Sequence, residues 1–353
     1  MTRCHAPGFP VPDLFLFQDG ARVHTAQDWP RRRQEIQSAL LTLQYGPLPA
    51  VPDALHCAIL HVATLRRMDS AQLLSCRIDM GDDGAFMLRL FLPTGAGPFP
   101  VVLNGDGCWH YADDGVIAAV LRRRYAFAQF NRVEVAPDPP AAGLDAKAEV
   151  KTSPAHGAIA AWAWAYQRAV DALQQIAQVD CTCIAVVGHS RGGKASLLAG
   201  ATDPRIMLTS ANNSGAGGAG CWRHAGPGAE TLADITQAFP HWFAPGLQDY
   251  AGREFDLPLD QHFLKALVAP RALLTTEALG DLWANPAGTW HTHVAARAAY
   301  QLLGAEDTCM VAYREGGHDH SPADWDVLLD HCDVALRGAA LKPALHHVYA
   351  LAP

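Results

Sequence analysis

One serine in this chain has the neighbours of a catalytic nucleophile. Ser190 occupies the centre of a Gly-x-Ser-x-Gly signature at residues 188–192. An apolar run typical of a strand, residues 184–187, precedes the signature, and a small-residue segment suited to a helix follows it. A tight turn between a strand and a helix lifts a serine hydroxyl above the edge of a sheet, and glycine tolerates the strained dihedral angles of such a turn. This context favours a nucleophilic Ser190 over an ordinary strand-to-helix connection that contains a serine.

A serine hydroxyl is a poor nucleophile near neutral pH, so it needs a basic partner. Two histidines follow the last strand-like run, residues 309–313, where a hydrolase of this kind places its base. We expect His318 to be the base, because Gly316 and Gly317 before it let the loop bend toward the serine, and His320 is the alternative. A His-x-His pair can also bind a metal ion. No third ligand stands at a diagnostic spacing, so the sequence predicts neither a metal nor a cofactor.

The histidine in turn needs a carboxylate that orients it. The strand-like run at 271–276 is followed by Glu277 and then by Asp281, which lies in the loop just past a glycine. We expect Asp281 to be the acid because that loop is the usual place for it, and Glu277, nearer the strand end, is the second choice. The order serine, acid, histidine along the chain is the order of the α/β-hydrolases.

Acyl transfer also requires donors aimed at the negative charge that develops on the substrate. We expect one donor to be the backbone N–H of Arg191, the residue after the nucleophile. The other is expected from the loop after residues 100–104, where Gly105 and Gly107 keep backbone N–H groups accessible. A guanidinium beside the nucleophile is costly to desolvate unless it meets an anion or a polarised carbonyl. The plainer alternative is that the Arg191 side chain pairs with a neighbouring carboxylate.

Alternating strands and helices must position these groups. Strand-like runs at 100–104, 125–130, 184–187, 206–210, 271–276 and 309–313 alternate with helical segments at 118–123, 156–176, 294–303 and 324–336. Before them, residues 58–92 resemble antiparallel strands. The alternation predicts an α/β-hydrolase, with a mostly parallel sheet covered by helices on both faces in a three-layer sandwich.

The chain is expected to form a single α/β-hydrolase domain over residues 1–353. Residues 1–50 are expected to be an N-terminal extension with one helix at 29–44. Residues 211–262 are rich in Gly, Trp and His and are expected to form an insertion near the active site, with one helix at 231–238.

Composition excludes several classes of partner. Half of the 353 residues are hydrophobic and 18% are charged, as in globular proteins with a sizeable core. The net charge is −8, and the Lys/Arg runs are only the triplets at 31–33 and 122–124, so nucleic acid is not an expected partner. No run of 18 apolar residues occurs, so no membrane partner is expected. The N-terminus shows no signal-peptide core; the chain as written is expected to be cytoplasmic, or secreted or periplasmic if a leader has been removed.

Further motifs resemble those of one family, the glucuronoyl esterases, and in particular their bacterial members. The similar stretches are Ser-Arg-Gly-Gly-Lys at 190–194, Ser-Gly-Ala-Gly-Gly-Ala at 214–219 and Cys-Trp-Arg at 221–223, followed in the same order by 241–243, 257–262, 269–273, Trp283, 317–318 and 324–325. The likeness runs from about residue 100 to residue 335 and is looser before that.

The resemblance implies a serine-type α/β-hydrolase that cleaves esters of 4-O-methyl-glucuronic acid, the bonds that join glucuronoxylan to lignin. It implies that Arg191 supports the oxyanion and that Lys194 binds hydroxyls of the sugar. It also implies that Glu230 and Trp283 contact the glucuronoyl ring. The expected partner is therefore a glucuronate ester, either a small molecule or an oligosaccharide.

The chain departs from the family pattern at two places. Many members carry the triad acid just before the Ser-Gly-x-Gly-Gly stretch, where this chain has Asn213, which cannot serve as a carboxylate. Other bacterial members are similar to this chain in placing the acid after the following strand, which favours Asp281. Fungal members form a disulfide between cysteines beside the serine and after the histidine, where this chain has His189 and Ser321.

Two other functions stay open at this point. One is an esterase for acetylated sugars or simple carboxylic esters, and the other is a catalytically inactive, carbohydrate-binding relative of the hydrolases. An intracellular enzyme could not reach intact wood. The alternative to a polymeric substrate is therefore a small glucuronoyl ester that is imported into the cell.

Overall fold

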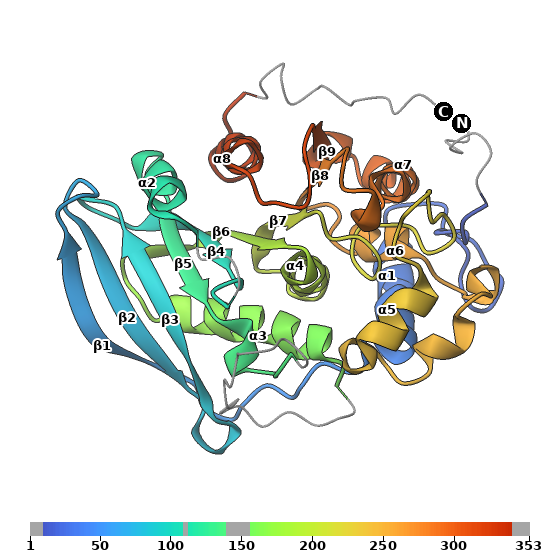
Figure 1. Cartoon of the computed structure of the whole chain (residues 1–353), viewed down its shortest axis with the longest axis horizontal. Coiled ribbons are helices and arrows are strands. Elements are labelled where there is room, and N and C mark those ends of the chain that lie inside the picture. The colour runs from blue at the N-terminus through green and yellow to red at the C-terminus, as the bar shows by residue number, and fades with distance from the viewer. Residues whose placement is uncertain (1–9, 109–111, 139–155, 341–353) are drawn as a thin grey trace.

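The computed structural model describes residues 10–108, 112–138 and 156–340, and in these residues one sheet of nine strands forms the centre (Figure 1). The strands are β1 (His56–Leu65), β2 (Ala71–Asp79), β3 (Ala85–Leu92), β4 (Phe99–Asn104), β5 (Ala126–Phe130), β6 (Val179–His189), β7 (Ile206–Asn212), β8 (Ala272–Ala278) and β9 (Cys309–Arg314). Their order across the sheet is β1-β2-β3-β5-β4-β6-β7-β8-β9. The pairs from β1 to β5 are antiparallel, and every pair from β5 through β4 to β9 is parallel, which confirms the predicted sheet.

The parallel strands are buried on both faces, which explains their nearly continuous apolar runs. In β4, Val101 and Leu103 pack in the core on one face of the sheet, and Val102 packs in a second core on the other face. In β6, Val186 and Val187 divide between the two cores in the same way. Successive side chains of a strand point to opposite faces, so a run without polar gaps indicates that helices cover both of them.

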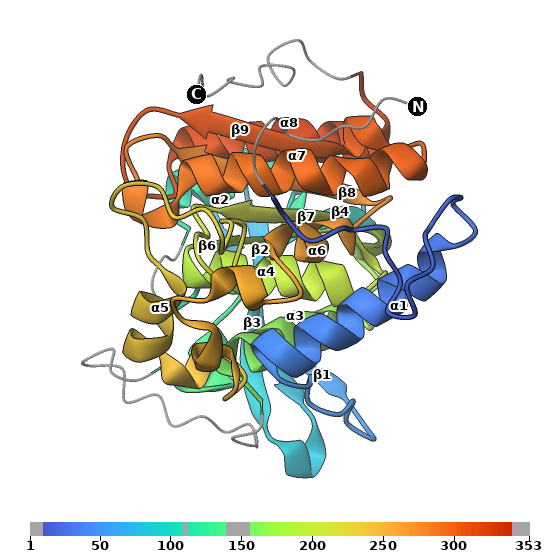
Figure 2. The ribbon, with the colours of Figure 1, turned by 90° about the vertical axis from the view of Figure 1, so that its right-hand side faces the viewer.

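Helices cover the two faces unequally (Figures 1 and 2). In the described part of the chain they are α1 (Trp29–Leu40), α2 (Asp114–Arg122), α3 (Ala158–Leu173), α4 (Arg191–Thr202), α5 (Leu232–Ala238), α6 (Gln261–Ala266), α7 (Pro286–Leu302) and α8 (Pro322–Arg337). α2 and α8 pack on one face through residues such as Ile117 and Trp325. α3 and α4 pack on the other face, together with α1, α6 and α7. This three-layer arrangement confirms the predicted fold class.

The helices differ from the prediction mainly at their ends. α7 begins at Pro286 rather than at residue 294, because Asn285 caps it by accepting a hydrogen bond from Gly288 N. Its first two turns lack apolar periodicity, so the sequence pattern missed them. α5 agrees with the prediction, and Thr231 with Asp234 forms a capping box at its start. α6 was not predicted.

The N-terminal extension packs against the insertion at 211–262. α1 continues into a π-helical turn, Leu41–Tyr45. Tyr45 Oη donates a hydrogen bond to Gly217 O at 3.0 Å, and Ala244 N donates to Gln44 O at 2.8 Å. Residues near the start of the chain therefore hold the insertion beside the C-terminal edge of the parallel strands.

Two further findings concern the described ranges as a whole. None of their helices is long and apolar enough to cross a membrane. The eight cysteines that lie in these ranges are free thiols.

Candidate active site

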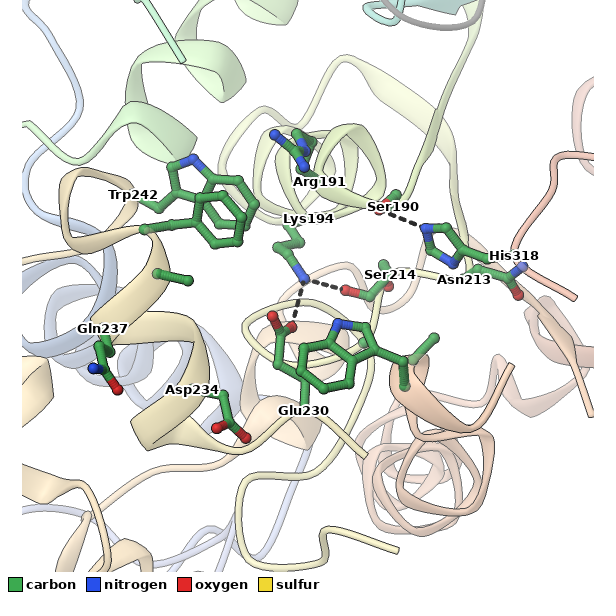
Figure 3. A pocket seen from close by; sticks show the side chains of 15 residues that line it. Ser190, Arg191, Lys194, Asn213, Ser214, Glu230, Asp234, Gln237, Trp242 and His318 are labelled. Carbon is green, nitrogen blue, oxygen red and sulfur yellow. Dashed lines mark hydrogen bonds and ion pairs between the residues drawn. The ribbon is translucent and has the colours of Figure 1, made fainter. Parts of the chain in front are cut away.

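Ser190 lies in the turn between β6 and α4, at the C-terminal edge of the parallel strands (Figure 3). Its φ of 55° and ψ of −122° are rare for a residue with a side chain. A Cβ atom on Gly188 would collide with the backbone of Gly192, and a Cβ atom on Gly192 would collide with the Asp106 carboxylate. Both positions of the signature therefore require glycine, because neighbouring atoms leave no room for a side chain. The turn that these glycines allow presents the serine hydroxyl above the sheet.

A buried carboxylate holds this turn from beneath. Asp106, in the loop after β4, accepts a hydrogen bond from His189 N at 2.7 Å and forms an ion pair with Arg132, which follows β5. His189 Nδ1 lies 2.5 Å from Asn212 Oδ1 at the end of β7. The residue before the nucleophile is thus fixed by groups from the neighbouring strands on both sides.

The side chains of Ser190, His318 and Asp281 meet at this edge of the sheet. His318 Nε2 lies 2.9 Å from Ser190 Oγ, and His318 Nδ1 lies 2.5 Å from Asp281 Oδ2. Asp281 belongs to the loop after β8, residues 279–281 (the acid loop), and His318 belongs to the loop after β9, residues 315–320 (the base loop). The Asp281 side chain is 5% exposed and the His318 side chain 43% exposed, so the carboxylate is shielded from water while the ring reaches the surface.

Backbone hydrogen bonds join the acid loop to the end of β9 and to the base loop. Leu279 N donates to Arg314 O at 2.8 Å, and Gly280 N donates to Gly316 O at 3.0 Å. A Cβ atom on Gly280 would collide with Gly316 O, and Gly316 itself has a φ of 112°. Both glycines therefore let the two loops run close together and bring Asp281 to His318.

The alternative acid and the alternative base lie elsewhere. Glu277 is fully buried within β8 and accepts a hydrogen bond from Thr289 Oγ1 of α7 at 3.0 Å. Burial raises the pKa of Glu277 to about 8. His320 stacks on Trp325 of α8, with ring centroids 4.6 Å apart. The hydrogen-bonded pair at the serine is formed by the first choices, Asp281 and His318.

The expected oxyanion donors are found only in part. Arg191 is the first residue of α4 and directly follows Ser190, where the first expected donor has to lie. Gly105 N donates to Tyr166 Oη at 2.8 Å, and Gly107 N donates to Phe130 O at 3.1 Å. The expectation that these two glycines leave their N–H groups accessible is therefore wrong, because the fold already uses both groups.

The Arg191 guanidinium lies at the cavity and is held by a carboxylate. Its Nη1 donates to Asp138 Oδ2 at 2.8 Å, and Asp138 also accepts from Trp242 Nε1 at 2.8 Å and lies 3.1 Å from His241 Nε2. Burial alone raises the pKa of Asp138, but the hydrogen bonds from His241, Arg191 and Trp242 outweigh burial and lower it to about 2. The plainer alternative for Arg191, pairing with a neighbouring carboxylate, is thus found, and the guanidinium also lies over the rings of Trp242 and Phe239, 4.8 and 5.2 Å from their centroids.

A cavity of about 740 Å³ opens beside the serine, and a buried ammonium group lies in its wall (Figure 3). Lys194 Nζ donates to Ser214 O at 2.7 Å and to Ala216 O at 2.6 Å, and Glu230 Oε2 lies 4.0 Å away. Burial lowers the pKa of Lys194 to about 8. Burial also raises the pKa of Glu230, against the opposing charge of Lys194. A hydrogen-bond donor, Lys194, and an acceptor, Glu230, therefore lie together in a part of the cavity wall that is largely shielded from water. Such a pair suits the hydroxyl groups of a sugar.

Trp283 lies at the rim of the same cavity and is 53% exposed. Its carbonyl accepts a hydrogen bond from Glu230 N at 3.1 Å, so the two residues are tied together. Six predicted site residues therefore line one cavity, and Asp281 lies behind one of them, His318.

Sequence reasoning missed other residues of this site. Asp234, Gln237, Phe239 and Trp242 also line the cavity. Asp234 and Gln237 are three residues apart in the helix predicted at 231–238, which places them on one face of it and is a signal that could have found both. Asp138 gave no such signal, because its partners are distant in the sequence.

A hydroxyl, an imidazole and a carboxylate in series can carry out acyl transfer through a covalent intermediate. Within residues 10–108, 112–138 and 156–340, no group of three or more His, Cys, Asp or Glu side chains is arranged to hold a metal ion.

Comparisons with known proteins point to one family. The family model described as glucuronyl esterase, fungi, matches residues 78–304. A carbohydrate esterase, MZ0003, from an unknown prokaryotic organism is 31% identical, and the match covers 95% of this chain and 91% of that protein. A 4-O-methyl-glucuronoyl methylesterase of Podospora anserina is 32% identical over 87% of this chain, which spans only 63% of that longer protein. Among solved structures, a family 15 carbohydrate esterase, the glucuronoyl esterase from Caldicellulosiruptor kristjansonii, superposes with a TM-score of 0.78 at 29% identity, covering 96% of this chain and 97% of that one.

The family model covers more than half of the chain, and the prokaryotic carbohydrate esterase matches nearly all of it. The solved structure agrees in fold over the same extent. The chain belongs to the glucuronoyl esterase family.

Proposed function

We propose that this chain is a serine-type hydrolase that cleaves esters of glucuronic acid or 4-O-methyl-glucuronic acid. The observation that carries the proposal is the hydrogen-bonded series from Ser190 to Asp281, which borders a cavity containing Lys194 and Glu230. A glucuronate ester offers a carbonyl carbon to the serine, hydroxyls to the ammonium and the carboxylate, and a ring face to Trp283. The names of the relatives support this substrate class.

The geometry suits a two-step reaction. Ser190 Oγ attacks the ester carbonyl while its proton passes to His318 Nε2, and Asp281 holds the other ring N–H. His318 then gives the proton to the departing alcohol, which leaves a glucuronoyl ester on Ser190. Water attacks this ester, its proton again goes to His318, and glucuronate leaves as Ser190 recovers its hydrogen. We expect Arg191, the residue after the nucleophile, to support the oxyanion in both steps.

The substrate class is tested with a panel of esters. Benzyl and methyl glucuronate, their galacturonate epimers, acetylated xylose and 4-nitrophenyl acetate are compared by kcat/KM. We expect the glucuronate esters to be the best substrates, because Lys194 and Glu230 recognise hydroxyls that the simple ester lacks. A preference for acetylated xylose or 4-nitrophenyl acetate would favour the acetyl-sugar or general esterase instead.

Lys194→Met is expected to change selectivity rather than chemistry. The variant removes hydrogen bonds from a charged donor, each contributing about 1.5–3 kcal/mol. We therefore expect kcat/KM for benzyl glucuronate to fall about 10- to 150-fold, with a much smaller change for 4-nitrophenyl acetate. Lys265→Met is the matched control, because Lys265 is equally buried but donates to Thr289 O and Thr292 Oγ1 between α6 and α7. Equal losses on both esters in Lys194→Met would contradict a role in sugar recognition.

Asp138→Asn is expected to weaken the oxyanion support. The variant keeps the size of the side chain but removes the charge that holds the Arg191 guanidinium. We expect kcat to fall about 10- to 100-fold, because misplaced catalytic groups lose rates of this order, while the enzyme stays folded by circular dichroism. His241→Gln is the control, since His241 contacts Asp138 without holding Arg191. If the folded Asp138→Asn variant has an unchanged kcat, Asp138 does not support the oxyanion through Arg191.

A further inference from the structure

Asn213 lies just beyond β7, and its side chain contacts Ala278, the last residue of β8, directly before the acid loop. A φ of 42° at Asn213 turns the chain away from the sheet after the last residue of β7. The Asn213 backbone N–H still donates to Thr276 O of β8 at 2.9 Å. Two residues further along β8, the backbone N–H of Ala278 donates to Asn213 Oδ1 at 2.8 Å. The side-chain amide oxygen thus accepts the hydrogen bond that a further backbone carbonyl of β7 would have accepted if the strand had continued.

The other end of the Asn213 amide faces the base loop. Its Nδ2 lies 3.5 Å from Gly317 O and 3.4 Å from Asp319 O, the carbonyls of the residues on either side of His318. Arg314 Nη2 donates to the same two carbonyls. Figure 3 shows Asn213 beside the His318 ring. Two donors from different strand ends therefore hold the peptide units that flank the ring.

We propose that Asn213 is a positioning residue, which fixes the acid loop and the base loop relative to each other and so keeps His318 between Asp281 and Ser190. It is 1% exposed, so water does not compete for these hydrogen bonds. The role rests on the proposed function, since it is defined by the catalytic base.

The contacts require an amide rather than a carboxylate. An amide offers an acceptor to the Ala278 N–H and donors to two carbonyls at the same time, whereas an ionised aspartate offers acceptors only. An aspartate at position 213 would direct an oxygen at Gly317 O and Asp319 O and would repel the base loop. Position 213 is therefore expected not to accept the triad acid in this chain.

Asn213→Gly is the variant that tests the proposal. Glycine adopts a positive φ without strain, so this change removes the side chain and leaves the turn. We expect kcat for benzyl glucuronate to fall about 10- to 100-fold, with KM changed less than about threefold, because the base is displaced while Lys194, Glu230 and Trp283, the sugar contacts of the proposed function, are unchanged. Ser70→Gly, at φ 59° in the distant β1–β2 turn, is the matched control and is expected to leave kcat unchanged.

A spectroscopic measurement separates positioning from a general effect on folding. The proton on His318 Nδ1, shared with Asp281 at 2.5 Å, is expected to give a sharp downfield proton NMR signal that disappears in His318→Ala. In Asn213→Gly this signal is expected to broaden through exchange with water, while the thermal unfolding midpoint shows a folded protein. An unchanged signal together with kcat within twofold of the wild type would overturn the proposal.

Two aspartate variants complete the test. Asn213→Asp, which is isosteric, is expected to lower kcat at least as much as Asn213→Gly, and it replaces that variant if the glycine protein does not fold. The double variant Asn213→Asp with Asp281→Asn is expected to be as inactive as Asp281→Asn alone; restored activity would make position 213 an acid site and overturn the inference. If the wild-type protein is inactive on every ester, the proposed function is wrong. The NMR comparison needs no substrate, so it would still show whether Asn213 holds His318 against Asp281.

Discussion

Ser190→Ala is expected to lower kcat/KM for benzyl glucuronate by about 10⁴- to 10⁶-fold, the range found when the nucleophile of such a triad is removed. The alanine cannot form the glucuronoyl-enzyme intermediate, so only the stabilisation of the oxyanion and the binding of the substrate remain. Initial rates on benzyl glucuronate measure the loss, and a fluorophosphonate probe followed by peptide mapping reports whether residue 190 is the one modified in the wild type.

Ser196→Ala is the matched control for this experiment. Ser196 lies in α4, the helix that follows Ser190, but it is fully buried and donates to Gly193 O and Ser210 O, away from the cavity. We expect it to be labelled by the probe at residue 190 and to keep its activity. Retention of most activity by Ser190→Ala would exclude Ser190 as the nucleophile. A wild-type protein that neither reacts with the probe nor hydrolyses esters would fit a carbohydrate-binding relative without catalysis.

Asp281→Asn is expected to lower kcat by about 10⁴-fold, as the same change does in other triads. An amide next to His318 Nδ1 allows the ring to bind its proton on the wrong nitrogen, so Nε2 no longer accepts the serine proton. The Asp281 carboxylate is nearly buried and lies 2.5 Å from the ring, so no water replaces it readily. Initial rates measured from pH 5 to 9 give the loss and show whether any pH restores activity.

Glu277→Gln is the comparison that decides between the two carboxylates. Burial raises the pKa of Glu277 to about 8, so below that pH the carboxyl is mostly protonated and an amide resembles it closely. We expect a small change in kcat, below about tenfold, and a modest change in stability through the hydrogen bond from Thr289 Oγ1. The opposite ranking of the two variants would transfer the role of the acid to Glu277.

The meeting of Ser190, His318 and Asp281 was predictable because each of them is tied to a local pattern. The glycines at 188 and 192 around Ser190 are demanded by the turn itself, so the motif carries its own geometry. The loops with Asp281 and His318 follow strands of a parallel sheet, and the C-terminal ends of such strands share one edge. Placement after a strand was therefore enough to bring the three side chains together.

The remainder of the site depends on contacts between distant segments, which no local pattern reveals. Asp138 contacts Arg191 and Trp242, and nothing in the proline-rich sequence around Asp138 indicates either partner. The error at Gly105 has the same origin, because a phenol from α3, that of Tyr166, takes up its N–H. The positioning contacts of Asn213 join three strand ends and are likewise absent from the sequence pattern.

The contact of Tyr45 with Gly217 bears on how this enzyme can be shortened or recombined. Gly217 follows Ala216, whose carbonyl accepts from Lys194, so the π-helical turn near the start of the chain stands directly behind the cavity wall that contains Lys194. A truncation that spares every strand of the sheet but removes the first 45 residues takes away the outer support of that wall. Chimaeras within the family should therefore exchange the N-terminal segment and the insertion at 211–262 as a pair.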